Sequence, residues 1–231
     1  MNDKQVGQFF DQLSEDYTAV IERCFPRYRE MLWALLDYLP SDRAFTAIVE
    51  LGCGTGNLSV LLAEAFPEAT IRFVDVSSDS LAVCRSRLGD ADRLAFERQD
   101  FRELNYASGS IDLAISSIAV HHLTSTEKRQ LFRQVFDWLS PGGAFCFADQ
   151  FRGATDALYA RHMHHWRELS MTAGSSDDEW NMWMEHQREH DHHDLLADQL
   201  GWLAECGFTE VDCVWRYLLW AVVQARKSSV R

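Results

Sequence analysis

The residues most suggestive of chemistry form a glycine-rich turn. An apolar run over residues 47–51, interrupted only by Glu50, is followed by Gly52, Gly54 and Gly56 at alternate positions. Glycine permits positive φ angles and lets a ligand come close to the backbone, so a strand that turns sharply into a helix here can cradle a ligand. The spacing is G-x-G-x-G and not G-x-G-x-x-G. This spacing argues against a pyrophosphate seat and favours a nucleoside that carries an amino-acid tail.

Two acidic residues could complete this nucleoside site. Asp75 ends the second apolar run, nineteen residues after Gly56, where a carboxylate can accept hydrogen bonds from both ribose hydroxyls. Asp100 ends the third run, where it could meet the adenine amino group while Phe101 or Val76 flanks the ring. The alternative is that both acids only cap helices or turns. We expect the ligand to lie across the carboxyl ends of the first three strands.

A histidine pair, His121 and His122, follows the fourth apolar run. An imidazole there could deprotonate a hydroxyl or amine at neutral pH. The alternative is that one of the two caps the next helix or packs on the ligand. His186 and His190 are four residues apart on one predicted helix face and could bind zinc, but no third ligand is fixed by the sequence. We therefore predict no metal site.

Alternating strands and helices must position these residues. The predicted strands are 47–51, 70–76, 93–99, 111–117, 144–148, 210–215 and 218–225, and the intervening helices include 57–66, 80–88 and 126–139, with a turn at 140–143. The last two strands are separated by two residues and must therefore pair antiparallel. We predict an α/β, Rossmann-like, doubly wound, seven-stranded sheet that is mostly parallel with an antiparallel C-terminal edge hairpin. A helical N-terminal segment and a helical lid insertion would add to it.

These segments resemble the motifs of class I S-adenosylmethionine-dependent methyltransferases. The matching phrases are ELGCGTGNLS, FVDVSSDSL, RQDF, SIDLAISSIAVHHL, LSPGGAFCFADQ and QLGWLAECGF. The resemblance covers roughly residues 9–151 and resumes at 199–227, where the last phrase and the final hairpin match the usual ending of the family. The resemblance implies one methyltransferase domain over 1–231. It would have N-terminal helices at 1–40, a cofactor-binding core at 41–151, a lid at 152–198, and a closing helix and hairpin at 199–231. Its cofactor would be S-adenosylmethionine.

The resemblance also assigns roles to individual residues. The implied cofactor contacts are Glu50, Gly52, Cys53, Gly54, Gly56, Asp75, Val76, Asp100, Phe101 and Ser116, with Ser117 an alternative to Ser116 beneath the sulfonium. His122 precedes Leu123 as the catalytic histidine does in phosphoethanolamine methyltransferases, whose A-I-L-H-L phrase is similar to residues 119–123. Those enzymes pair that histidine with an N-terminal tyrosine. The implied catalytic residues are therefore His122, His121 and Tyr17.

The expected activity is methyl transfer to an oxygen or nitrogen atom of a small molecule. Residues 25–28, the fifth strand and the closing hairpin are also similar to carboxy-S-adenosylmethionine synthase, which would need an arginine such as Arg161 or Arg167 for its extra carboxylate. A non-catalytic cofactor-binding protein is the third alternative. The His-, Trp- and Met-rich stretch 156–197 is predicted to be a substrate lid, with helix packing or a dimer surface as the alternative.

Composition narrows the partners. The formal net charge of −13 makes a nucleic-acid substrate a poor expectation, because such a surface repels phosphate backbones. No apolar stretch is long enough for a membrane span, and the N-terminus has no apolar signal region. The six cysteines lack a C-x-x-C pair and are expected to be reduced and mostly buried. We expect a cytoplasmic protein that binds a small-molecule acceptor and no nucleic acid or membrane, and that could form a homodimer.

Overall fold

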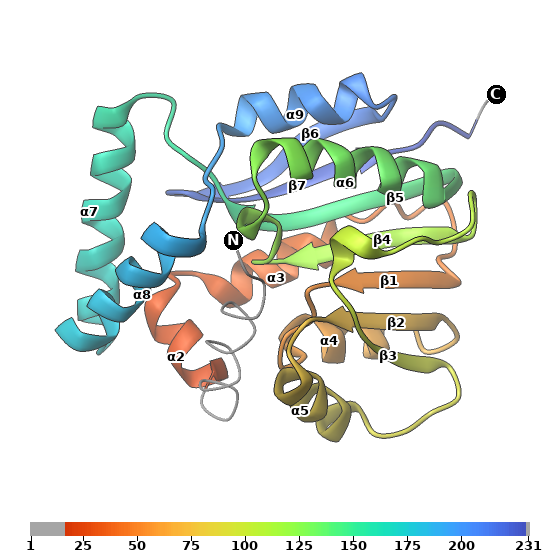
Figure 1. The fold of residues 1–231 in the computed structure, drawn as a ribbon, viewed down its shortest axis with the longest axis horizontal. Helices are drawn as coiled ribbons and strands as arrows, with labels where there is room; N and C mark the ends of the chain where they lie inside the picture. The colour runs from red at the N-terminus through yellow and green to blue at the C-terminus, as the bar shows by residue number, and fades with distance from the viewer. Residues whose placement is uncertain (1–16, 230–231) are drawn as a thin grey trace.

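The computed structural model describes residues 17–229 and is built on one seven-stranded sheet in the order β3-β2-β1-β4-β5-β7-β6 (Figure 1). The strands are β1 (Ala47–Leu51), β2 (Thr70–Asp75), β3 (Leu94–Arg98), β4 (Ile111–Ser117), β5 (Leu139–Gln150), β6 (Thr209–Tyr217) and β7 (Trp220–Arg226). Strands β1 to β5 pair in parallel, and β7 runs antiparallel to both β5 and β6. The predicted Rossmann-like sheet with a C-terminal hairpin is confirmed.

Helices cover both faces of the sheet. They are α2 (Tyr17–Cys24), α3 (Tyr28–Asp37), α4 (Asn57–Ala65), α5 (Ser78–Leu88), α6 (Ser125–Trp138), α7 (Asp156–Thr172), α8 (Asp177–His190) and α9 (Leu196–Glu205). One core cluster joins α3, α4 and α5 to the sheet through residues such as Leu35 and Leu62. The other joins α6 and α9 to the opposite face through residues such as Phe132 and Leu203. Because each face has its own buried apolar layer, the sheet is doubly wound.

Strand β5 begins earlier than predicted. The segment 140–143, predicted as a turn, lies inside β5 as a bulge, where the β4 pairing passes from Leu139 directly to Ala144. The carboxylate of Asp112 on β4 holds this bulge, because Oδ1 accepts a hydrogen bond from Ser140 Oγ at 2.7 Å and faces the guanidinium of Arg43. The turn-forming residues therefore bend the strand locally but do not end it.

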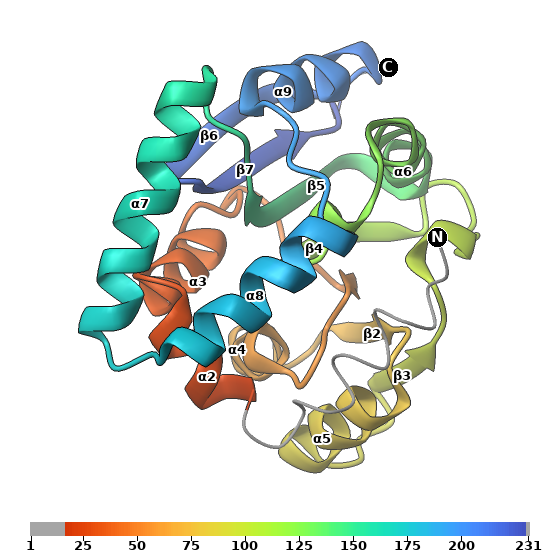
Figure 2. The same cartoon turned by 60° about the vertical axis from the view of Figure 1, so that its left-hand side comes forward.

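Helices α7 and α8 lie beyond the carboxyl ends of β1 and β4, at the left of Figure 1, and Figure 2 shows α8 crossing in front of this edge. Phe25 anchors them, with ring centroids 5.7 Å from Trp166 on α7 and 5.5 Å from Trp183 on α8. Trp220 of β7 lies 5.4 Å from the same ring. Much of the aromatic content of this stretch is therefore core packing, which fixes α7 and α8 over the sheet edge. Among the described helices, none is long and apolar enough to cross a membrane.

Candidate active site

The loop after β1 is fastened to the end of β2. The amides of Gly52 and Cys53 both donate to the carbonyl of Val74, at 2.9 and 3.0 Å. The amide of Gly54 donates to Oδ2 of Asp75 at 2.7 Å, and the other carboxylate oxygen accepts from the amide of Ser77 at 2.9 Å. Asp75 therefore holds both the glycine loop and the start of the turn into α5.

A cavity opens beside this loop. Its walls come from the carboxyl ends of β1, β2 and β4, the position where open α/β sheets bind ligands. The lining residues are Tyr28, Glu50, Gly52, Cys53, Gly54, Thr55, Asn57, Leu58, Asp75, Val76, Ser80, Phe101, Ser117, Ile118, Ala119 and His122. The structure therefore brings together most of the predicted cofactor contacts and His122.

The cavity fits a bound nucleoside with a polar tail. A Cβ built on Gly54, whose φ is +52°, meets nothing within 4 Å, so the backbone is open to a ligand there. By contrast, a Cβ on Gly52 would lie 2.4 Å from the Cβ of Ala119, so that glycine is required by packing. The Oγ1 atom of Thr55 is buried and has no hydrogen-bond partner among residues 17–229, which suits a polar ligand group.

Glu50 forms a buried acidic position in the wall of this cavity. It is 1% exposed, and its Oε2 accepts a hydrogen bond from Ser59 Oγ at 2.7 Å. Burial, and then the neighbouring Cys84 thiol, raises the pKa of Glu50 well above its ordinary value. A ligand amino group placed here would stabilise the charged carboxylate, because an opposite charge favours the ionised form.

Some predicted contacts lie elsewhere. Asp100 lies outside the cavity, because Arg102 engages its carboxylate. Its Oδ1 accepts a hydrogen bond from the backbone amide of Arg102 at 2.8 Å and another from the Arg102 guanidinium at 3.0 Å. The hydroxyl of Ser116 donates a hydrogen bond to the carbonyl of Leu51 at 2.7 Å and does not line the cavity. Ser117 lines the cavity instead. Gly56 caps α4 below the cavity, where a Cβ would lie 2.8 Å from Cys84 Sγ.

Tyr17 is the first residue of α2, but its side chain lies outside the described residues. Tyr28 is not among the residues predicted from the sequence, but it lines the cavity from α3. Burial raises the pKa of its hydroxyl to about 12, so it remains protonated at neutral pH. The hydroxyl accepts a hydrogen bond from Asn57 at 3.4 Å, which fixes it beside the glycine loop.

The two histidines have different surroundings. His121 is 3% exposed and lies behind the cavity, with Nδ1 at 2.5 Å from Asp149 Oδ1 and its amide donating to Asp149 Oδ2 at 2.8 Å. Burial lowers the pKa of His121, but the carboxylates of Asp149 and Asp191 outweigh burial and leave it raised. His122 faces the cavity, and burial followed by the charge of His121 lowers its pKa. The lowered pKa leaves His122 neutral at pH 7.

Histidines from three segments surround the carboxylate of Asp191. Its Oδ1 lies 3.6 Å from His121 Nε2, 3.2 Å from His122 Nδ1 and 3.7 Å from His186 Nε2, and its Oδ2 lies 3.6 Å from His193 Nε2. Burial raises the pKa of Asp191, but the surrounding imidazoles, His121 first, hold it well below its ordinary value. Asp191 is therefore an anion enclosed by imidazoles.

The segment after α8 is tied down so that Asp191 stays in place. The amide of His192 donates to the carbonyl of His121 at 2.7 Å. Lys128 of α6, which is fully buried, pairs with Asp194 Oδ2 at 2.7 Å and also donates to the carbonyl of His192. These contacts join the segment after α8 to the histidine pair after β4.

Sequence reasoning missed Asp149, Asp191 and His193 in this cluster. Asp149 could have been found, because it lies at the carboxyl end of β5 and β5 neighbours β4 in a parallel sheet. Nothing in the sequence shows that the segment after α8 folds back onto β4. The predicted pair His186 and His190 has ring centroids 5.0 Å apart, but only His186 approaches Asp191.

Comparison with known proteins agrees with this geometry. A model of the methyltransferase domain family matches residues 48–143. A Geobacillus thermodenitrificans protein, named an uncharacterized methyltransferase, is 30% identical over 165 residues, which cover 67% of this chain and 74% of that protein. The malonyl-[acyl-carrier protein] O-methyltransferase of Priestia megaterium is 32% identical over 132 residues, covering 56% of this chain and 46% of that protein. The chain thus spans about half the length of this second relative.

The fold is also found among solved structures. A crystal structure of an S-adenosylmethionine-dependent methyltransferase from Mesorhizobium loti aligns with a TM-score of 0.61 at 24% identity, covering 85% of this chain and 98% of that chain. This likeness shows the fold, while the sequence relatives show the family. The chain therefore belongs to the class I S-adenosylmethionine-dependent methyltransferases, whose cofactor is S-adenosylmethionine.

Proposed function

We propose that the chain transfers a methyl group to an oxygen or nitrogen atom of a small molecule. The observation that carries the proposal is a single cavity with the open backbone of Gly54 and the carboxylate of Asp75 in one wall and His122 in another. When bound, S-adenosylmethionine supplies a reactive methyl group on its sulfonium. Glu50 and Gly54 would hold the amino-acid tail, Asp75 the ribose, and Val76 with Phe101 the adenine.

The acceptor would enter next to His122. Methyl transfer needs the acceptor atom, the methyl group and the sulfur in line, so most of the chain's contribution is positioning and exclusion of water. Ile118 and Ala119 provide an apolar wall at this point, and His122 provides a polar group whose pKa is lowered by burial. An acceptor hydroxyl or amine that must lose a proton would lose it at this end, beside His122 and Asp191.

The cavity wall also favours certain acceptors. Among its described lining residues there is no lysine or arginine. An uncharged hydroxyl or amine therefore suits the cavity better than a free anionic group, which would need a cation. The Priestia megaterium relative is by name an O-methyltransferase, which supports an oxygen acceptor.

A two-stage experiment tests the proposal. Isothermal titration calorimetry with S-adenosylmethionine measures cofactor binding, and release of S-adenosylhomocysteine with a panel of phenols, alcohols and amines measures transfer. We expect binding and acceptor-dependent turnover in the wild type. In His122→Gln we expect unchanged cofactor binding and turnover reduced about 10²- to 10⁴-fold, the range for loss of proton transfer.

The matched control is His164→Gln. His164 is exposed on α7, and its Nε2 lies 3.4 Å from the carboxylate of Glu168. Its turnover should equal that of the wild type. Cofactor binding without turnover on every acceptor would favour a binding protein over an enzyme. Absence of cofactor binding in the wild type would overturn the proposal.

A further inference from the structure

We propose that His121, His122 and Asp191 bind a divalent transition-metal ion beside the cofactor cavity. One ligand atom from each residue lies within 4.8 Å of the other two. The proposal stands on the geometry of these side chains and does not depend on the proposed methyl transfer.

The spacing of the atoms fits ligands around an ion. Asp191 Oδ1 lies 3.2 Å from His122 Nδ1 and 3.6 Å from His121 Nε2. Hydrogen bonds between nitrogen and oxygen are about 2.7–3.2 Å long, so the second contact is too long for one. Ligands placed about 2.0–2.1 Å from a tetrahedral zinc ion lie about 3.3 Å from one another, close to the observed separations.

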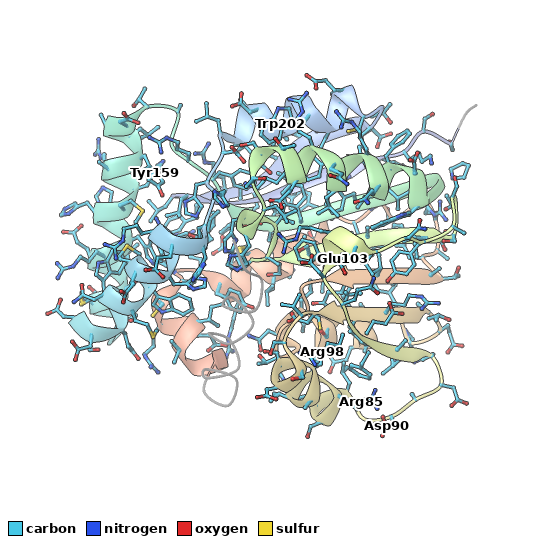
Figure 3. All side chains as sticks on the ribbon, in the orientation of Figure 1. Arg85, Asp90, Arg98, Glu103, Tyr159 and Trp202 are labelled. Carbon is cyan, nitrogen blue, oxygen red and sulfur yellow. The ribbon has the colours of Figure 1, made fainter. Side chains whose placement is uncertain are left out.

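The imidazoles are oriented as metal ligands usually are. A coordinating histidine commonly directs its second ring nitrogen to a carboxylate or another fixed partner. His121 does so, with Nδ1 at 2.5 Å from Asp149 and Nε2 towards Asp191. His193 repeats the arrangement, with Nδ1 at 2.8 Å from the hydroxyl of Tyr159 and Nε2 at 3.6 Å from Asp191 Oδ2. Tyr159 lies on α7, where it is labelled in Figure 3, and its hydroxyl accepts a hydrogen bond from Gln187 at 3.1 Å.

The burial and the charge of these side chains also favour a bound metal ion. The side chains of His121, His122 and Asp191 are 3%, 14% and 5% exposed. Two buried carboxylates, Asp149 and Asp191, face this cluster, so a dipositive ion would balance their charge. Imidazole ligands suit zinc, iron, nickel and copper better than magnesium or calcium. His186, whose Nε2 is 3.7 Å from Asp191 Oδ1, is a candidate fourth ligand.

The ion would be within reach of an acceptor in the cofactor cavity. His122 lines that cavity, and Ile118 lies in its wall and also in the wall of the small cavity formed by His121, His186 and Asp191. If the proposed function holds, the acceptor would bind the ion through its oxygen. The O–H bond would break with its electron pair left on oxygen and its proton passing to solvent, because the ion stabilises the anion. His122 would then act as a ligand and no longer as the proton acceptor.

Metal titration of the full chain, purified without a histidine tag and stripped with EDTA, tests the proposal. Zn²⁺ is the probe. Calorimetry measures its binding, and elemental analysis after gel filtration measures how much metal stays bound. We expect one ion per chain in the wild type and a higher melting temperature with Zn²⁺, since the ion binds the folded state. Asp191→Asn should bind Zn²⁺ at least a hundredfold more weakly. Tyr159→Phe, which removes the hydroxyl that contacts His193 and Gln187, should bind it about tenfold more weakly.

The control is His164→Gln on the exposed face of α7, which should bind Zn²⁺ like the wild type. Circular dichroism checks that each variant is folded, and Tyr159→Phe remains informative if Asp191→Asn is not. Absence of a stoichiometric ion in the wild type, or equal Zn²⁺ affinity in the wild type and both site variants, would overturn the proposal. Because these measurements contain no cofactor, their failure would leave the methyl-transfer proposal standing, and the reverse also holds.

Discussion

The amide of Gly54 donates a 2.7 Å hydrogen bond to the carboxylate of Asp75, and this contact joins the glycine loop to the acid at the end of β2. The same carboxylate accepts from the amide of Ser77 through its other oxygen. The residue expected to hold the ribose therefore also shapes the loop expected to hold the amino-acid tail. Removing the whole side chain would disturb both, so a conservative substitution gives the clearer test.

Asp75→Asn should lower cofactor affinity about 10- to 100-fold, because a charge-assisted hydrogen bond is worth about 1.5–3 kcal/mol. The asparagine keeps one oxygen that can accept from a backbone amide. Calorimetry with S-adenosylhomocysteine measures the loss. Asp90→Asn is the matched control, since Asp90 is exposed between α5 and β3, far from α7 and α8 in Figure 3. Equal affinity of Asp75→Asn and wild type would remove Asp75 from the cofactor site.

Gly54→Ala should weaken cofactor binding beyond its effect on stability. The new methyl group would enter open space in the free protein but occupy room that the ligand needs. Gly109→Ala is the matched control, because its φ is +72° and a Cβ there also meets nothing within 4 Å. Both changes put alanine at a positive φ and should cost about 1–2 kcal/mol of unfolding free energy. Only Gly54→Ala should lose cofactor affinity in calorimetry. A similar affinity in both variants would contradict a ligand beside Gly54.

Asp112→Asn should lower the free energy of unfolding by about 2 kcal/mol at pH 7, because it removes the charge facing Arg43. Burial raises the pKa of Asp112, but hydrogen bonds from Ser140 and Thr46 outweigh it and leave the pKa below its ordinary value of 3.8. A lowered pKa stabilises the fold fully above that value, and the stabilisation is lost as the pH falls through the folded pKa. Urea unfolding should therefore show the difference shrinking below about pH 4. A gap that stays constant down to pH 2.5 would refute this assignment.

Lys128→Met should lower the free energy of unfolding by about 3–5 kcal/mol, because it leaves Asp194 in a partly buried position without its cation. The segment after α8 would also lose a tie to α6. Arg129→Met is the control on the same helix. Arg129 pairs with the exposed Glu205 and lies over Trp202, labelled on α9 in Figure 3, and its loss should cost at most about 1 kcal/mol. Thermal and urea unfolding measure both variants, and equal losses would show that Lys128 has no special structural role.

The order of strands and helices was predictable because it depends on local patterns. Apolar runs separated by helical periodicity determine a parallel sheet, and a two-residue link between the last two strands determines the antiparallel hairpin. The position of that link was wrong by two residues, because it lies at Leu218–Leu219 and was predicted at 216–217. The predicted start of β5 was wrong for a physical reason. Residues 140–143 have the composition of a turn, and only their pairing with β4 and the contact of Ser140 with Asp112 keep them in the strand as a bulge.

Part of the candidate site was also predictable from the sequence. Gly54 and Asp75 meet because the carboxyl ends of neighbouring parallel strands lie at one edge of the sheet. Ser116 and Ser117 show where this reasoning stops. Side chains alternate along a strand, so one of the two faces the cavity, and the sequence does not say which. Asp100 was likewise placed at the right strand end, but Arg102 engages its carboxylate.

The sequence by itself determined the family, the sheet and the glycine loop with its acid, because these depend on residues near one another in the chain or on neighbouring strands. Only the tertiary structure decided how the histidines are used. His121, Asp149 and Asp191 come from three separate segments, and they meet because α7 and α8 pack on Phe25 and Lys128 draws the following segment towards α6. Such a meeting depends on the packing of the whole core, which no local pattern encodes.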